Sequence, residues 1–183
     1  DVYKRQETTA SFTISEPESI SISSTISDYN GYAVSCNGAQ DGNIDISVSG
    51  GTGVFTYSWS SGETTQDISE LVAGTYQLTV TDSNNCQISE TFVIEQPDKL
   101  SLVAEVNQVS CKGASDSNID ITITGGTPNY TYKWTKNNES FSTNEDISNL
   151  SPGEYKVVIT DLNDCEITSQ TFKITEPDEL LIE

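Results

Sequence analysis

A stretch of 26 residues occurs twice in this chain, and it constrains the fold more than any other feature of the sequence. Residues 34–59 read VSCNGAQDGNIDISVSGGTGVFTYSW, and residues 109–134 read VSCKGASDSNIDITITGGTPNYTYKW. Sixteen of the 26 aligned positions are identical. Self-similarity at a fixed spacing is the signature of a repeat protein, in which each copy forms one structural unit. We therefore expect two copies of one fold.

A second set of landmarks gives the period of the repeat. The segments SFTISEP, TFVIEQP and TFKITEP end at Pro17, Pro97 and Pro177, which are 80 residues apart each time. This phasing predicts repeat one over residues 18–97 and repeat two over 98–177. Residues 1–17 are then a non-native leader (DVYKRQ, which matches neither repeat) followed by the last strand of an earlier repeat, and residues 178–183 begin a following one. We expect the chain to be part of a longer array.

Apolar residues alternate with polar ones through both repeats, which is typical of half-buried strands. Expected strands are 44–48, 55–59, 76–80 and 88–94 in repeat one, and 119–123, 130–134, 155–159 and 167–174 in repeat two. Turn-forming residues separate them, including the Gly-Gly pairs at 50–51 and 125–126. Short strands with such breaks predict an all-β fold, with two β-sandwiches of about 80 residues placed end to end.

Two details make the immunoglobulin-like sandwich the expected type. Tyr76 and Tyr155 follow Leu-x-x-Gly-x, the pattern of a tyrosine corner, and Trp59 and Trp134 fall on the strand that buries an aromatic residue in such folds. Repeat two has four additional residues between Trp134 and Leu150, interpreted as a surface insertion. It has one more before Phe172, interpreted as a bulge.

Charge and composition exclude several functions. The 183 residues include 8 basic and 28 acidic side chains, for a formal charge of -20, so nucleic acids and anionic lipids are repelled. The chain has no His and no Met, which removes His-based catalysis and His-based zinc sites. No pair of carboxylates is spaced as an acid and a base, and no long apolar run predicts a membrane span. We expect no enzyme activity and no membrane insertion.

The ordered motifs resemble a known family. Cys-x-Gly, Asp-x-Asn-Ile-Asp, Gly-Gly-Thr, Tyr-x-Trp, Leu-x-x-Gly-x-Tyr, Thr-Asp and a closing Cys are similar to the SprB-type repeat of large surface adhesins in gliding Bacteroidetes. The resemblance covers almost all of both repeats. It implies tandem immunoglobulin-like modules, exported by the type IX route to the bacterial cell surface and used in adhesion or gliding. The implied partners are neighbouring repeats and an extracellular polysaccharide or a solid surface.

In a surface protein the four cysteines are expected to form disulfides. The simplest pairing lies within each repeat, Cys36 with Cys86 and Cys111 with Cys165. In an immunoglobulin-like sandwich, however, Cys36 and Cys86 fall at opposite ends, and Cα atoms more than about 7 Å apart cannot be bridged. In a head-to-tail array Cys36 would instead approach Cys165. Both pairings stay open, with free thiols as a third alternative.

Clustered carboxylates suggest a calcium site, because Ca²⁺ takes about six to eight oxygen ligands. The candidates, together with Asn43, Asn84, Asn118 and Asn163, are Asp41, Asp45, Asp82, Asp116, Asp120, Asp161 and Asp164. The structural interpretation is favoured: the Asp residues between inward Ile residues face solvent, and Asp-x-Asn is common in turns. We expect no cofactor, with calcium as the alternative.

Aromatic residues give a second alternative function, that of a carbohydrate-binding or accessory module of a polysaccharide-degrading enzyme. The stacking candidates are Tyr57, Trp59, Tyr130, Tyr132 and Trp134. Their alternation places them on one strand face, which favours a role in the core.

The link between the repeats is predicted to be stiff. Few residues separate the last strand of repeat one from the first strand of repeat two, and Pro97 fixes its own φ. Glu95 and Asp98 are expected to face Asp161 and Asp164. To be stable, such a cluster of like charges requires exposure to solvent, a bound cation or a disulfide between Cys36 and Cys165.

Overall fold

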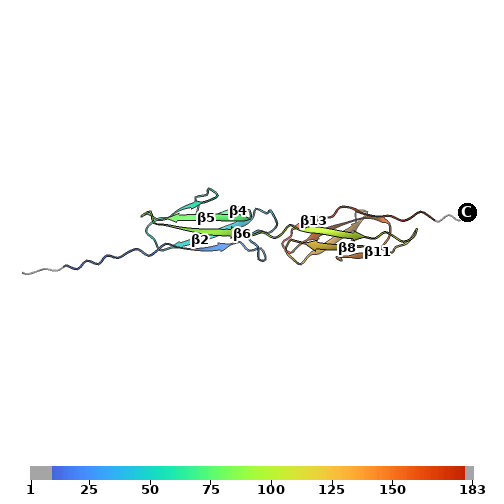
Figure 1. The fold of residues 1–183 in the computed structure, drawn as a ribbon, viewed down its shortest axis with the longest axis horizontal. Coiled ribbons are helices and arrows are strands. Elements are labelled where there is room, and N and C mark those ends of the chain that lie inside the picture. The colour runs from blue at the N-terminus through green and yellow to red at the C-terminus, as the bar shows by residue number, and fades with distance from the viewer. Residues whose placement is uncertain (1–9, 180–183) are drawn as a thin grey trace, which may run out of the picture.

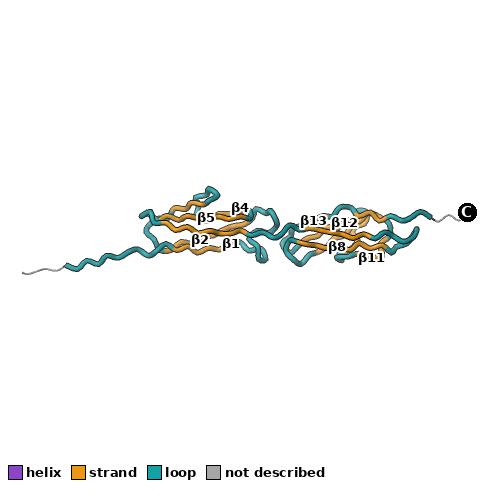
Figure 2. Tube along the Cα trace, viewed as in Figure 1, coloured by secondary structure: helices purple, strands orange, loops and turns teal. Residues whose placement is uncertain are grey.

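Two β-sandwiches follow one another along the long axis of the molecule (Figure 1). The structure is a computed structural model that describes residues 10–179, and its regular elements are all strands (Figure 2). The strands form separate antiparallel sheets that do not close into a barrel. The predicted fold class, two immunoglobulin-like sandwiches in tandem, is confirmed.

The first unit consists of two three-stranded sheets. One has the order β1-β2-β4 and the other the order β3-β5-β6. The strands are β1 (Ser21–Ile26), β2 (Gly42–Ser49), β3 (Thr56–Trp59), β4 (Ile68–Leu71), β5 (Gly74–Thr81) and β6 (Gln87–Ile94). Because neighbouring sheets face each other through alternate residues, the apolar face of each strand points inward.

The second unit repeats this arrangement with one additional edge strand. Its sheets have the orders β11-β8-β7 and β10-β9-β12-β13, and β14 also pairs with β12. The strands are β7 (Ser101–Val106), β8 (Ser117–Thr124), β9 (Thr131–Lys136), β10 (Glu139–Ser142), β11 (Ile147–Leu150), β12 (Gly153–Thr160), β13 (Glu166–Thr168) and β14 (Phe172–Ile174).

Each unit has its own hydrophobic core, centred on the tryptophan that the repeat predicted. Trp59 is 3% exposed and packs against Phe92, while Trp134 is fully buried and packs against Phe172. The core of the first unit contains residues of β2 to β6, and that of the second contains residues of β8, β9, β11, β12 and β14. The two cores are separate, so each unit has its own source of hydrophobic stability.

The two predicted corner tyrosines make the hydrogen bond that defines a tyrosine corner. The Tyr76 hydroxyl donates to the carbonyl oxygen of Val72 at 3.0 Å, and the Tyr155 hydroxyl donates to that of Ser151 at 2.8 Å. The environments differ, because Tyr155 is fully buried while Tyr76 is only partly buried. Phe141 contacts the Tyr155 ring edge-on at 5.4 Å.

We expect Tyr155→Phe to lower the free energy of unfolding of the second unit by about 1 kcal/mol, the net value of one hydrogen bond. Tyr76→Phe should lower the free energy of unfolding of the first unit by less, because water can replace the more exposed hydrogen bond there. Urea titration of the two variants checks this. Equal losses in both variants would contradict the role given to burial.

Both additional segments of the second unit have defined structures. The four-residue insertion was expected only to lie at the surface. It forms a hairpin of β9 and β10, closed by Asn137 and Asn138, which both have positive φ as a tight hairpin turn requires. The single additional residue is a bulge: Thr168 and Phe172 are four residues apart, while their partners Val158 and Tyr155 are three apart.

Residues 11–17, expected to form a strand of an earlier repeat, are not in a strand and are exposed. A strand needs neighbours to pair with its backbone, and these residues pair with no described strand. The predicted leader, residues 1–6, and most of the predicted start of a following repeat, residues 180–183, lie outside the described residues.

Candidate functional site

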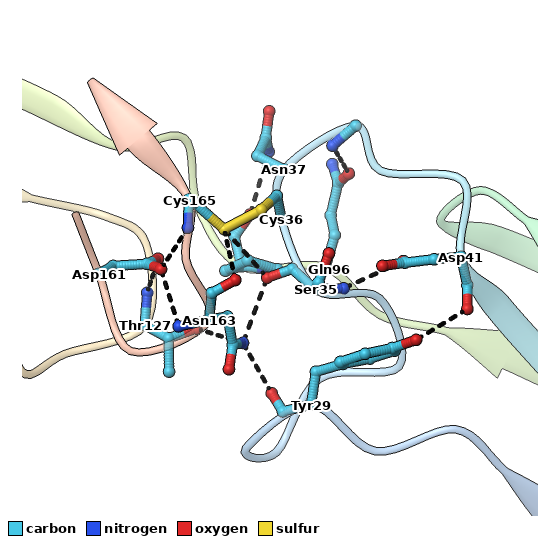
Figure 3. The surroundings of a disulfide bond; sticks show 12 residues. Tyr29, Ser35, Cys36, Asn37, Asp41, Gln96, Thr127, Asp161, Asn163 and Cys165 are labelled. Carbon is cyan, nitrogen blue, oxygen red and sulfur yellow. Dashed lines mark hydrogen bonds between the residues drawn. A yellow bond between two sulfur atoms is a disulfide. The ribbon is translucent and has the colours of Figure 1, made fainter. Parts of the chain in front are cut away.

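A disulfide bond joins the two units at their junction (Figure 3). Cys36 lies in the loop before β2 of the first unit, and Cys165 lies in the turn before β13 of the second. Their Cα atoms are 5.8 Å apart, within the range that a disulfide spans, although 129 positions separate them in the sequence. The covalent bond therefore braces one sandwich against the other.

The pairing within each repeat is not formed. Cys86 and Cys111 are free and exposed. The reason is the one the strand order suggested: Cys36 precedes β2 and Cys86 follows β5, so the two lie at opposite ends of one sandwich. The alternative junction pairing is the one present in the structure.

Hydrogen bonds from Asn163 reinforce the disulfide (Figure 3). Its side-chain nitrogen lies 3.0 Å from the carbonyl oxygen of Tyr29 and 3.2 Å from that of Ser35, both in the first unit. It also lies 3.0 Å from the Thr127 hydroxyl in its own unit. Asn30 completes the set by donating to the Asn163 side-chain oxygen. One partly buried amide thus connects the units.

The Asn163 contacts depend on a small hairpin, residues 28–32, that the alternation of apolar residues did not predict. Tyr29 and Tyr32 form an antiparallel bridge, and the Gly31 amide donates to the Asp28 carboxylate at 2.7 Å. The Tyr29 hydroxyl donates to the carbonyl oxygen of Asp41 at 3.2 Å and so fixes the hairpin to the loop that carries Cys36.

The hairpin is a five-residue insertion of the first unit. Ser27 and Asn107 occupy equivalent places, since their amides bond to the carbonyls of the equivalent Asn43 and Asn118. The sequence contains a signal for this insertion. The stretch at 34–59 recurs after 75 residues, whereas Pro17, Pro97 and Pro177 recur after 80, and this difference of five residues marks the insertion.

The linker between the sandwiches is bound to both of them. The amide of Gly126 donates to the Asp98 carbonyl at 2.8 Å, and the side chain of Asn37 donates to the Pro97 carbonyl at 3.0 Å. Gly125 is required here, because its φ is +74° and a Cβ atom would lie 2.2 Å from the Lys99 oxygen. The short linker is therefore held by hydrogen bonds from both sandwiches.

Two equivalent buried aspartates shape the turns that carry Cys86 and Cys165. One Asp161 oxygen accepts the amides of Asn163 and Cys165, both at 2.9 Å, and the other accepts the amide of Thr127 at 2.7 Å. Asp82 does the same in the first unit with Asn84, Cys86 and Thr52. These bonds hold each turn in one shape.

The pKa of Asp82 lies below its usual value. Burial raises this pKa, but the backbone amides of Cys86, Asn84 and Thr52 together lower it by more because they stabilise the carboxylate. A lowered folded-state pKa contributes stability above the unfolded value of about 4, and that contribution is lost as the pH falls through the folded value.

We therefore expect the melting temperature of the first unit to fall as the pH drops below about 4. Asp82→Asn should lower the melting temperature at neutral pH and flatten its acid dependence. Asp45→Asn, at an exposed position of β2, is the matched control. Calorimetry between pH 2 and 7 tests this. If the melting temperature of Asp82→Asn depends on pH as steeply as that of the unmodified chain, Asp82 does not have the stabilising role assigned to it.

The calcium candidates do not converge on one site. Within residues 10–179, no three acidic or Cys side chains form a group that could hold a metal ion. Asp82 and Asp161 are occupied by backbone amides, while Asp41 and Asp116 accept the amides of Ser35 and Ser110. Asp45 and Asp120 are exposed on their strands, and Asp164 is exposed in its turn.

The cluster of carboxylates expected at the junction is only partly present. Asp98 and Asp164 line one groove of about 390 Å³ beside the disulfide. Glu95 does not line it, and Asp161 is buried in its own turn. The Cys36 to Cys165 disulfide accompanies this arrangement.

The aromatic candidates lie in or against the cores. Trp59 and Trp134 are buried, and Tyr57, Tyr130 and Tyr132 are partly buried against the same clusters. Burial and the carboxylate of Glu145 raise the pKa of Tyr132 to about 12. A sugar-stacking face requires exposed rings, and neither tryptophan offers one.

The fold and the junction together define a class: tandem immunoglobulin-like units, here two of them, joined by a short link that a disulfide braces. The family model of the SprB repeat matches residues 34–64 and 103–139, one match in each unit. Two stretches of the chain thus match the SprB repeat, which is a structural repeat. No curated protein matches the chain. Among residues 10–179 there is no helix that could cross a membrane.

Proposed function

We propose that this chain is a non-catalytic, stiff spacer segment of a large secreted adhesin. The observation that carries the proposal is the junction, where the Cys36 to Cys165 disulfide, the Asn163 contacts and the bound linker connect two separate sandwiches. Interfaces between domains of one chain usually permit relative motion. A covalent cross-brace beside a short linker opposes that motion, so repetition extends the reach of the molecule without making it flexible.

The SprB repeat supports a place at the cell surface, since such repeats occur in cell-surface proteins. In this proposal the parent protein is exported by the type IX route and takes part in attachment or gliding. The segment positions an adhesive region away from the cell, and that region contacts an extracellular polysaccharide or a solid surface. The direct partners of the segment are the repeats on either side.

Small-angle X-ray scattering of the oxidised chain tests the spacer function. We expect the distance distribution of one rod, unchanged by a calcium chelator, because the brace is covalent and the described residues form no metal group. Electron paramagnetic distance measurements provide a second readout, between spin labels on Ser89→Cys and Thr122→Cys, one at an exposed position of each unit. Cys86 and Cys111, whose thiols are free and exposed, are replaced by Ser in the labelled chain. A broad distance distribution in the oxidised chain would contradict a stiff spacer.

The rival function is a carbohydrate-binding or accessory module. A panel of soluble polysaccharides and a glycan array separate the two, and we expect no binding that depends on Trp59 or Trp134, because both are buried. Strong binding that is lost in folded variants of the exposed surface would favour the rival. A hydrolase domain in the parent reading frame would favour the accessory role.

A further inference from the structure

We propose that the two ends of this chain are complementary halves of a second disulfide junction, whose partner is another repeat of the same kind. The loop that carries Cys111 receives the turn of a following repeat, and the turn that carries Cys86 is offered to the loop of a preceding one. A second copy of this chain supplies both halves. The inference rests on the proposed function, because it assumes that repeats stack end to end.

The turn at Cys86 already has the shape that the occupied junction uses. Its Asp82 accepts the amides of Asn84 and Cys86 at 2.8 and 2.9 Å, as Asp161 does for Asn163 and Cys165. Asn84 takes the place of Asn163, the residue that connects the units at the occupied junction. Both Asn84 and Cys86 are exposed, so the turn is available to a partner.

The loop at Cys111 is likewise built as the loop at Cys36. The amide of Ser110 donates to Asp116 at 3.0 Å, as the amide of Ser35 donates to Asp41 at 3.1 Å. The amide of Gly113 donates to the Glu176 side chain at 2.8 Å, matching the bond from Gly38 to Gln96.

An open groove lies at this loop, with a volume of about 500 Å³. Its lining residues are Ser110, Cys111, Lys112, Pro177, Asp178 and Glu179. Lys112 and Glu179 form an ion pair across it at 2.7 Å, with both side chains more than half exposed. An exposed ion pair contributes little to stability, so an incoming turn can displace it at low cost.

The second junction differs from the first in one respect. The hairpin at residues 28–32, which supplies Tyr29 and Asn30 to the occupied junction, has no counterpart before Cys111. The noncovalent contacts of Asn84 are therefore fewer, and the disulfide carries more of the connection. Junctions along the array thus come in at least two types.

The covalent step is thiol-disulfide exchange with a small disulfide such as oxidised glutathione. The Cys111 thiolate attacks the small disulfide and releases one thiol, and the Cys86 thiolate then attacks the mixed disulfide and releases the second. The two protein thiols lose two protons and two electrons in total, and the small disulfide is reduced to two thiols.

Two variants of the whole chain give a direct test. Cys86→Ser retains only the Cys111 thiol, and Cys111→Ser retains only the Cys86 thiol, while the Cys36 to Cys165 bond stays in both and is verified by peptide mapping. With oxidised glutathione, we expect the mixture to form a Cys111 to Cys86 heterodimer about tenfold faster than either variant alone forms a homodimer, as one favourable docking contact provides. Equal rates for all three pairings would overturn the proposal.

Asn84→Ala in the Cys111→Ser background tests recognition by the turn. We expect heterodimer formation to slow about fivefold, the effect of one lost hydrogen bond. Thr91→Ala, at an exposed position of β6, is the matched control and should not change the rate. Equal slowing by both would also overturn the proposal. If the ends fail to link while scattering still shows a stiff rod, this inference is wrong and the spacer function stands.

Discussion

Cys165→Ser should leave both sandwiches folded and let them bend at the junction. The disulfide spans 129 positions of sequence, and a cross-link over such a long loop lowers the entropy of the unfolded chain. By this model the free energy of unfolding falls by about 5 kcal/mol when the bond is lost. The remaining Asn163 contacts are hydrogen bonds of about 1 kcal/mol each, too few to hold the units in one orientation.

Two measurements check this result. Urea titration gives the loss of stability, and small-angle scattering gives the change from a stiff rod to a mixture of bent shapes. Cys86→Ser is the matched control, because it removes a free and exposed thiol. A rod that stays equally stiff in Cys165→Ser, or under a reductant, would show that the linker and Asn163 suffice without the disulfide.

Trp134→Ala should destabilise the second unit by about 3 to 5 kcal/mol while leaving the first folded. Trp134 is fully buried, and its removal leaves a large cavity at the centre of a core that does not extend into the other unit. The indole nitrogen also donates to the Asn144 carbonyl at 2.9 Å, which then loses its partner. We expect two separate unfolding transitions in place of nearly coincident ones.

The remaining tryptophan makes this test selective. In Trp134→Ala, fluorescence reports on Trp59 and thus on the first unit, while far-ultraviolet circular dichroism reports on both. Trp59→Ala is the mirror variant and should reverse the order of the transitions. One shared transition by both probes in Trp134→Ala would mean that the units unfold as one body.

Most of the strand framework could be predicted from the sequence because alternation has a direct physical cause. Side chains of a strand point to opposite faces, so a half-buried strand requires apolar residues at every second position. Ile44 and Ile46 in β2 and Leu78 and Val80 in β5 follow this rule and are all buried. The Tyr76 and Tyr155 corners were recognisable because their hydrogen bonds are local, reaching back four residues.

The short strands β4 and β11 escaped the same rule. In each, the two inward residues are three apart rather than two: Ile68 and Leu71 in β4, and Ile147 and Leu150 in β11. Glu70 and Asn149 have positive φ, and the register shifts beside them, so a bulge turns the next side chain back to the core. Spacing alone cannot reveal a bulge.

The sequence by itself determined the repeat, the two sandwiches, their separate tryptophan cores and the short linker at Pro97, because these features depend on periodicity and on local backbone chemistry. Only the tertiary structure decided the partner of Cys36. A disulfide requires two Cα atoms within about 7 Å, and for residues 129 positions apart that distance depends on how whole sandwiches are placed. The linker sets this placement by directing the end of one sandwich onto the turn at Cys165, while Cys86 stays at the far end of the first.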